Sequence, residues 1–182
     1  MVLTVDDDIV LETVDLKDAQ KRYEIIIENK GYLRQWLGWL DFYNCVDDVI
    51  NYTKLCQQRI EKKEAYIFSI YYKNEYVGCI EIQNIDHRNK KCEIGYWIAQ
   101  NASGKGIMIR SCQRVIEYIF NEIGLNKINI FTATKNFKSQ AIPQKLGFVK
   151  EGTLEDNECL YGNFVDNFVF GLTKENWTKI GN

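Results

Sequence analysis

The chain has 182 residues, of which 46% are hydrophobic and 26% charged, and its 23 basic and 25 acidic side chains give a net charge of −2. This composition is typical of one ordered globular domain, residues 1–182, which is long enough to bury a core without disulfides or metal ions. Duplex nucleic acid is usually bound by a concentrated basic surface, so the near balance of charge argues against direct nucleic-acid binding.

The first half of the chain predicts a strand, two helices and three further strands. Residues 9–14, IVLETV, alternate and are rich in β-branched types, which indicates a strand. Between Asp18 and Glu28, apolar side chains fall on one helical face. A tryptophan-rich loop, YLRQWLGWLD, follows, and Asp47 opens a second helix. Three strands come next, over residues 66–72, 76–84 and 92–99, the first two joined as a hairpin.

The second half alternates helices with strands. The pattern predicts a helix over 106–122, a strand over 127–134, a helix over 137–146, and closing strands over 148–154 and 164–172. Thr173 is expected to cap a last short helix that contains Trp177. Hairpins mixed with helical crossovers predict an α/β fold in which a mixed sheet packs against helices.

No targeting or membrane signal is visible in the sequence. The start, MVLTVDDDIVLE, lacks a basic region followed by an apolar stretch, and no apolar run approaches the ~20 residues that cross a membrane. The six cysteines lie far apart without a C-x-x-C pair, so we interpret them as small buried hydrophobic residues and expect no metal site. These features predict a soluble cytoplasmic protein with no membrane partner.

The most informative segment is GYWIAQNASGKGIMIRS, residues 95–111. Gly104, Lys105 and Gly106 lead from a strand into a helix, so the backbone can curl and point successive N–H groups at one place. The helix dipole adds a positive end, and Arg110 adds charge, so the segment is a candidate phosphate loop. An isolated G-x-G is more often a plain turn, and that alternative stays open at this point. Two better-known phosphate loops do not fit, because Gly106 replaces the Walker A Ser or Thr and Ile109 replaces the third glycine of the dinucleotide fingerprint.

This loop resembles the pyrophosphate loop of the GNAT acetyltransferase superfamily, Q/R-x-x-G-x-G/A. Gly104 and Gly106 match that pattern, and Asn101 departs from it at the first position. Residues 136–148, N-x-x-S-x-x-I-P-x-K-L-G-F, resemble the second segment of the family that contacts acetyl-CoA. The loop YLRQWLGWLD is similar to the W-L-P-W loop of the ribosomal-protein N-terminal acetyltransferase branch, with Gly38 in place of proline, and the ending L-Y-G-N-F-V-D fits the same branch.

The resemblance implies an acetyl-CoA-dependent N-acetyltransferase that needs no metal. It also implies the GNAT fold, a largely antiparallel sheet of about six to seven strands with four main helices. Its parallel strands 92–99 and 127–134 splay apart to admit the pantetheine arm. Asn136 and Ser139 are implied to line the thioester end. The other groups implied to hold acetyl-CoA are the backbone of Trp97, Ile98 and Ala99, the amides of Gly104, Lys105, Gly106, Ile107 and Met108, and the charge of Arg110.

The catalytic groups are implied less directly. Many family members protonate the leaving thiolate with a tyrosine at a position that is Pro143 here. This proline also frees the carbonyl of Ser139 from its helical hydrogen bond. In the ribosomal branch, the matching positions imply Ser139 as the acid and Glu158 as the base. Glu93 competes as the base, and either glutamate could instead be a solvated strand residue.

The acceptor is expected to be a primary amine, the N-terminal α-amino group of a ribosomal or other protein. Tyr32, Trp36 and Trp39 are candidates for the acceptor wall, with core packing as the alternative. The single histidine, His87, has no partner motif for catalysis. A polyamine or aminoglycoside acceptor, a catalytically silent acyl-CoA-binding module, and a homo-oligomer stay open at this point.

Overall fold

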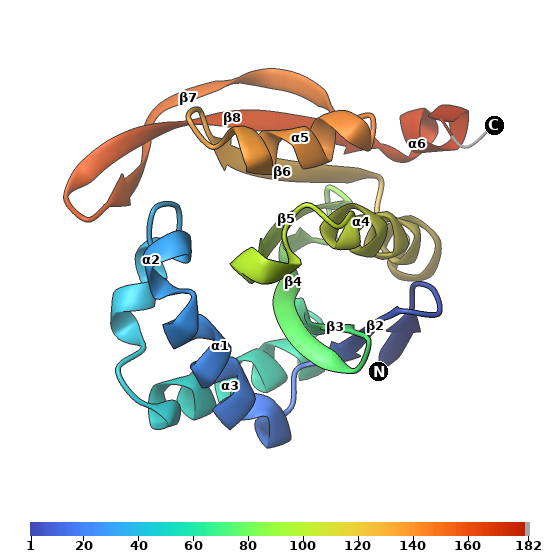
Figure 1. Ribbon diagram of the computed structural model, residues 1–182. Helices are drawn as coiled ribbons and strands as arrows, with labels where there is room; N and C mark the ends of the chain where they lie inside the picture. Colours follow the sequence, from blue (N-terminus) through green and yellow to red (C-terminus); the bar gives the residue numbers. More distant parts are fainter. Residues whose placement is uncertain (181–182) are drawn as a thin grey trace.

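The computed structural model describes residues 1–180, and Figure 1 shows their arrangement. Over this range eight strands form one sheet in the order β1-β2-β3-β4-β5-β6-β8-β7. The strands are β1 (Val2–Thr4), β2 (Ile9–Thr13), β3 (Tyr66–Tyr72), β4 (Glu75–Asp86), β5 (Lys91–Ile98), β6 (Lys127–Ala133), β7 (Val149–Leu160) and β8 (Asn163–Thr173). Neighbouring strands are antiparallel except β5 and β6, which run parallel.

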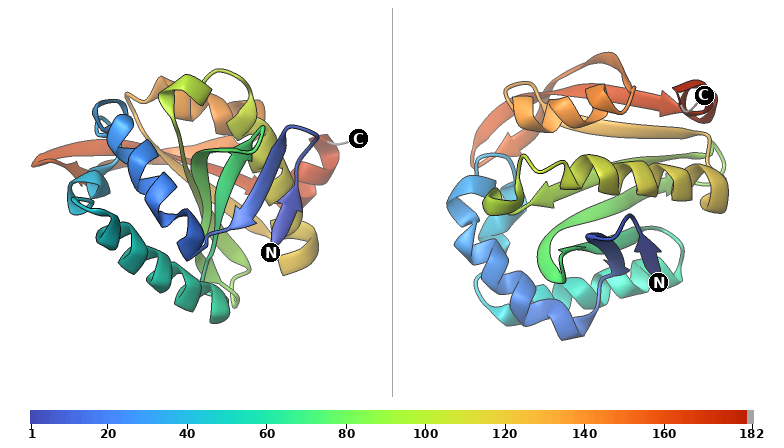
Figure 2. Two further views of the ribbon diagram at one scale, coloured as in Figure 1. Left: turned by 60° about the horizontal axis from the view of Figure 1, so that its bottom comes forward. Right: turned by 45° about the vertical axis from the view of Figure 1, so that its right-hand side comes forward.

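Helices cover both faces of this sheet, as the two views of Figure 2 show. Helices α1 and α3 pack on the face that carries Ile67, while α4 packs on the face that carries Phe68 and Ile80. The helices are α1 (Ala19–Glu28), α2 (Lys30–Leu33), α3 (Val46–Glu61), α4 (Ile107–Tyr118), α5 (Phe137–Lys145) and α6 (Lys174–Ile180). Four shorter turns are η1 (Leu16–Asp18), η2 (Gly38–Phe42), η3 (Gln100–Ala102) and the π-helical η4 (Ile119–Ile123).

The sheet opens at its single parallel pair. Strands β5 and β6 pair only from Lys91 opposite Lys127 to Glu93 opposite Asn129, whereas β5 stays paired with β4 as far as Ile98. The second half of β5 therefore lacks a neighbour on its β6 side. The predicted parallel strands that splay apart are confirmed, and Figure 1 shows β5 and β6 separating.

The predicted elements are confirmed with four differences. The sheet has one strand beyond the expected number because β1, with three residues, is too short to show a periodic pattern. The tryptophan-rich loop contains two short helical segments, α2 and η2. The helix predicted to reach residue 122 becomes π-helical after Tyr118, and the strand predicted to end at residue 154 continues to Leu160. The predicted cap is present, since Thr173 Oγ1 accepts from the Asn176 N–H at 3.2 Å.

The interpretation of all six cysteines as buried is wrong for two of them. Cys56, Cys92 and Cys112 are buried and Cys79 is partly buried, but Cys45 and Cys159 are exposed. Cys45 is exposed because it precedes the first turn of α3, where its backbone N–H donates to Asp48 at 3.0 Å. Cys159 is exposed because it lies in β7 at the edge of the sheet.

Candidate active site

Two cavities meet where β5 leaves β6. The first, about 420 Å³, lies between the end of β5, the start of α4 and α5, and we call it the loop cavity. The second, about 670 Å³, lies between the sheet and the segments α1, η2 and α3, and we call it the aromatic cavity. The residues that line both, and so mark their junction, are Trp36, Leu37, Tyr96, Trp97, Asn136 and Ser139.

The predicted phosphate loop forms one end of the loop cavity. Gly104 and Gly106 have φ of +80° and +73°, the left-handed region that glycine adopts without strain. Gly106 is the N-cap of α4 and offers no side-chain acceptor, so the N–H groups of the first helical turn are free for a ligand. Ile107 and Met108 of that turn line the cavity with the two glycines. This geometry suits an anion at the start of α4.

The two basic residues predicted beside this loop lie away from the cavity wall. Arg110 donates through Nη1 to the Asp6 carboxylate, so its charge is already paired. The Lys105 side chain is exposed, with Nζ at 5.9 Å from the centre of the Tyr72 ring. Instead, α5 supplies lysines to the cavity wall, among them Lys138, which the sequence analysis missed.

The hydrogen bonds of β5 decide which of the three residues predicted to bind the pantetheine arm have backbone groups free to do so. Ala99 donates its N–H to the Val77 carbonyl at 2.8 Å, and its carbonyl accepts from Ala102 at 3.1 Å. Hydrogen bonds in an antiparallel ladder recur at every second residue, so Trp97 also turns its backbone groups toward β4. Of the three predicted residues, Ile98 is the one whose backbone faces the opening between β5 and β6.

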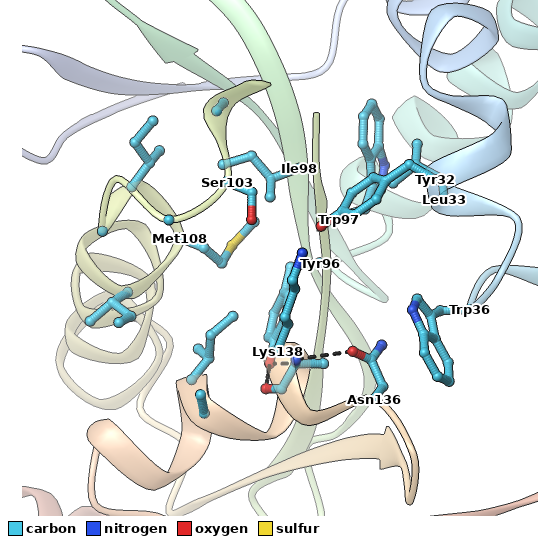
Figure 3. Close-up of a pocket in the computed structure, with 18 of the residues that line it drawn as sticks. Tyr32, Leu33, Trp36, Tyr96, Trp97, Ile98, Ser103, Met108, Asn136 and Lys138 are labelled. Carbon is cyan, nitrogen blue, oxygen red and sulfur yellow. Dashed lines mark hydrogen bonds between the residues drawn. The ribbon is translucent and has the colours of Figure 1, made fainter. Parts of the chain in front are cut away.

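The start of α5 brings two predicted residues to the junction. Asn136 is the N-cap of α5, and its Oδ1 accepts from the Ser139 N–H at 3.1 Å. The Ser139 carbonyl, which Pro143 leaves without a helical partner, accepts from the Tyr96 hydroxyl at 3.1 Å. Burial raises the pKa of Tyr96, so this phenol is a protonated donor at neutral pH. Figure 3 shows Tyr96 extending from β5 toward α5, with Asn136 and Trp36 beside it.

Ser139 and Tyr96 also share a hydroxyl contact. Ser139 Oγ lies 3.4 Å from Tyr96 Oη, which links the helix that carries the predicted acid to the splayed strand. Tyr96 was not predicted as a site residue because a tyrosine in an alternating strand resembles a core residue. The sequence signal that could have pointed to Tyr96 is Pro143. Because proline has no N–H, the carbonyl of Ser139, four residues earlier, needs a hydrogen-bond donor from outside the helix.

Tryptophans dominate the aromatic cavity. Trp36 and Trp39 both line it, and the Trp39 ring is 5.2 Å from Tyr43 and 6.3 Å from Trp97 between centres. Trp39 packs against core residues and also lines the cavity, so its acceptor-wall role stays a prediction beside core packing. Tyr32, by contrast, lines only the loop cavity, with Lys138 Nζ 5.3 Å from its ring centre. Its position fits the acetyl-CoA side better than the acceptor wall.

The two candidate bases lie in different surroundings. Glu158 is half-buried in β7 and lines the aromatic cavity with Ser139, and its carboxylate accepts from Asn167 Nδ2 at 3.5 Å. Glu93 lines neither cavity and accepts from Asn84 Nδ2 at 2.9 Å. The structure therefore brings Glu158, and not Glu93, into the cavity that Ser139 shares.

A third carboxylate, Glu81 in β4, lines the aromatic cavity and was missed. Its side chain is 20% exposed and lies 3.4 Å from Arg59. Burial raises the pKa of Glu81, and the Arg59 guanidinium opposes that shift. The residue opposite it in β5 is Gly95, which has no side chain to cover it. This arrangement can be recognised only from the strand register, because a glutamate in an alternating strand is otherwise typical of a solvent-facing position.

Within residues 1–180, no group of three or more His, Cys, Asp or Glu side chains could hold a metal ion. None of the helices described above is long and apolar enough to cross a membrane.

Comparisons with known proteins agree with this geometry. Residues 8–149 match the model of the acetyltransferase (GNAT) domain. YdaF of Bacillus subtilis (strain 168), a candidate ribosomal N-acetyltransferase by name, is 33% identical over 177 residues, 95% of each chain. The ribosomal-protein-serine acetyltransferase of Escherichia coli (strain K12) is 27% identical over 164 residues, 90% of this chain and 92% of its own.

Solved structures give the same result. The microcin C7 self-immunity acetyltransferase MccE, in complex with acetyl-CoA and AMP, superposes with a TM-score of 0.89 at 30% identity. That match covers 93% of this chain and 94% of the other. The chain belongs to the GNAT acetyltransferase family, and it is an N-acetyltransferase that uses acetyl-CoA as its cosubstrate.

Proposed function

We propose that this enzyme transfers the acetyl group of acetyl-CoA to the N-terminal α-amino group of a protein in the cytoplasm. One observation carries the proposal: the aromatic cavity, with Glu158 in its wall, joins the loop cavity at Ser139, Asn136 and Tyr96. An amine in one cavity can therefore meet a thioester in the other. The name of the Escherichia coli relative, a ribosomal-protein-serine acetyltransferase, supports a protein N-terminus as the acceptor.

In this proposal the loop cavity holds acetyl-CoA largely through the backbone. The free N–H groups of Gly106, Ile107 and Met108 bind the pyrophosphate at the positive end of α4. The backbone of Ile98 binds the arm in the opening beside β5. Lys138 adds charge from α5. Such backbone donors are fixed by the fold and need no rearrangement when the ligand binds.

The chemistry is divided between the two sides of the junction. Glu158 takes a proton from the acceptor ammonium, and the neutral amine attacks the thioester carbonyl directly. As the C–S bond breaks, the attacking nitrogen loses its second proton, and the leaving thiolate gains one through the Ser139 hydroxyl, which Asn136 and Tyr96 hold in place. An α-amino group with a pKa near ~8 gives up its proton more readily than a lysine near ~10.4, which favours a protein N-terminus.

A small cationic acceptor is the second candidate. The carboxylates that line the aromatic cavity are Asp48, Glu81 and Glu158, and Arg22 is its lining guanidinium. This excess of acidic groups also suits a polyamine, whose several ammonium groups need more than one carboxylate. It gives no equivalent reason to favour a neutral or anionic acceptor.

Mass spectrometry of acetylated products is the decisive experiment. Purified enzyme and acetyl-CoA are incubated with ribosomal proteins, with a cytoplasmic protein extract, and with spermidine or an aminoglycoside in separate reactions. We expect a gain of one acetyl group at a protein N-terminus. Acetylated spermidine without any protein product would transfer the assignment to the second candidate, and no acetylated product in any of these reactions would refute both candidates.

A further inference from the structure

The tip of the β7–β8 hairpin has a backbone conformation that its first residue does not favour. Leu160 pairs with Asn163, so Tyr161 and Gly162 form a two-residue turn in which both have positive φ, +53° and +83°. Such turns favour Asn-Gly or Gly-Gly, because a bulky L side chain is strained in the left-handed region. Strand pairing alone does not explain a tyrosine at this position, so the explanation should lie in the contacts of its side chain.

That side chain contacts the loop that carries Trp36 and Trp39. The Tyr161 hydroxyl donates to the Leu37 carbonyl at 2.7 Å, and the Arg34 Cζ atom lies 3.5 Å from the centre of its ring. Figures 1 and 2 show the hairpin tip curving toward α2 from the opposite end of the chain. The turn is therefore joined to the aromatic loop by one hydrogen bond and one cation–π contact.

Arg34 is itself fixed across this loop. Its Nε and Nη2 donate to Asp41 Oδ1 and Oδ2 at 3.1 and 2.8 Å, a two-point contact that holds the guanidinium plane. Arg34 follows α2 and Asp41 lies in η2, so the pair connects the two ends of the loop. Between them, Trp36 and Leu37 line both cavities. The Tyr161–Leu37 hydrogen bond, the Tyr161–Arg34 cation–π contact and the Arg34–Asp41 pair together fix the position of the loop that carries Trp36 and Trp39.

We infer that Tyr161 is a positioning residue for the acceptor: it holds the Trp36–Trp39 loop closed over the aromatic cavity and so sets acceptor affinity. This inference rests on the proposed function, which places the acceptor in that cavity. Glu158 lies in the same hairpin but is held separately, by pairing with Val165 and by Asn167. The described wall of the loop cavity includes no residue of β7 or β8. Trp36 and Leu37 line both cavities, but the loop cavity takes most of its wall from other segments, so loss of the contact should raise the acceptor KM most, with a smaller change in acetyl-CoA affinity and kcat preserved.

Two substitutions separate this role from a structural one. Tyr161→Phe removes the hydroxyl and keeps the ring on Arg34, whereas Tyr161→Asn removes both contacts and places a residue that tolerates positive φ in the turn. With a synthetic peptide that begins with serine as acceptor, we expect Tyr161→Phe to raise its KM about three- to tenfold. Tyr161→Asn should raise it further, with a melting temperature no lower than that of the original protein.

The matched control is Tyr23→Phe. Tyr23 also donates its hydroxyl to a loop carbonyl, that of Asn44 at 2.9 Å, and this bond does not involve the hairpin. Its KM should stay within twofold of the original. Unchanged KM in both Tyr161 variants would overturn the inference, as would a matched fall in kcat and acetyl-CoA affinity with a lower melting temperature.

Hydrogen exchange in the free protein tests, without any acceptor, whether Tyr161 holds the Trp36–Trp39 loop closed. The amides of Trp36 and Leu37 donate to the Leu33 carbonyl, so their exchange reports opening of the loop. Tyr161→Phe should speed their exchange, and Tyr23→Phe should not. If the peptide is not acetylated, the proposed function fails on its own. Equal exchange rates in Tyr161→Phe and the original protein would then still refute the inference that Tyr161 holds the loop closed.

Discussion

The two cavities are built from different parts of the chain. The loop cavity takes most of its wall from two continuous segments, residues 96–109 and 136–145, and offers backbone groups at helix starts. The aromatic cavity is lined by side chains from α1 through to β8, and it offers rings and carboxylates. A ligand common to the whole family can be held by backbone that many sequences form, whereas an acceptor that differs between members needs side chains that can change. Substitutions in the two cavities should therefore affect different kinetic constants.

The largest effect is expected at Glu158, on the aromatic side. Glu158→Gln keeps the shape of the side chain and its contact with Asn167 but removes the proton acceptor. We expect kcat to fall by about 10²–10⁴-fold, the usual cost of losing a general base, with acetyl-CoA affinity unchanged. Rates measured at saturating acetyl-CoA test this.

Glu93→Gln is the control for that experiment. Because Glu93 lines neither cavity, its loss should slow the reaction less than about tenfold. The reverse ranking of the two variants would move the base to Glu93. If neither variant is slowed, the proton leaves to solvent and the enzyme contributes mainly positioning.

Gly106 should give the next largest effect, confined to the loop cavity. A Cβ at Gly106 meets no atom within 4 Å, but the residue has φ of +73° and belongs to the turn proposed to bind the pyrophosphate. Gly106→Val should therefore weaken acetyl-CoA binding by roughly 30- to 1,000-fold through strain and steric block, as calorimetric titration would show. Gly124→Val is the matched control, since Gly124 has φ of +79° and equally open space but lines neither cavity. Equal affinities for the Gly106 and Gly124 variants, both folded, would refute the phosphate-loop assignment.

Ser139 lies at the junction, so its substitution asks which cavity it serves. If its hydroxyl stabilises the leaving thiolate, Ser139→Ala should lower kcat by roughly 10- to 100-fold while acetyl-CoA affinity is kept. Tyr96→Phe should show a smaller effect of the same kind, because Tyr96 acts through Ser139. A matched fall in acetyl-CoA affinity would instead make Ser139 part of the acetyl-CoA site. Steady-state kinetics with calorimetry separates the two.

The smallest effect is expected at Lys105. Its ammonium is exposed and does not line the loop cavity, so it acts on the phosphates only through solvent. Lys105→Ala should weaken acetyl-CoA binding by about two- to fivefold at low salt and not measurably at high salt. A large loss that persists at high salt would show a direct contact.

How far the sequence predicts each cavity follows the same division. The glycine pair at 104 and 106 predicts part of the loop cavity from local residue types, because glycine permits the backbone conformation of that turn. The resemblance of residues 136–148 to the GNAT family adds Asn136 and Ser139 to the same cavity. The aromatic side depends on register and on distant segments. Glu81 becomes a lining residue only because Gly95 lies opposite it, and Glu158 reaches the cavity only because β7 extends past the predicted end of the strand. No local pattern contains either fact.

Pro143 has a structural consequence beyond its helix. Pro143 has no N–H, so no helical donor at this position competes with the Tyr96 hydroxyl for the Ser139 carbonyl. The resulting hydrogen bond ties α5 to β5 across the open side of the sheet. The paired start of β5 and β6 closes one end of that opening, and the Tyr96–Ser139 hydrogen bond joins the unpaired part of β5 to α5. The width of this slot is then fixed at two points. A protein that must bring two separate molecules within bonding distance gains from a slot whose walls cannot drift apart.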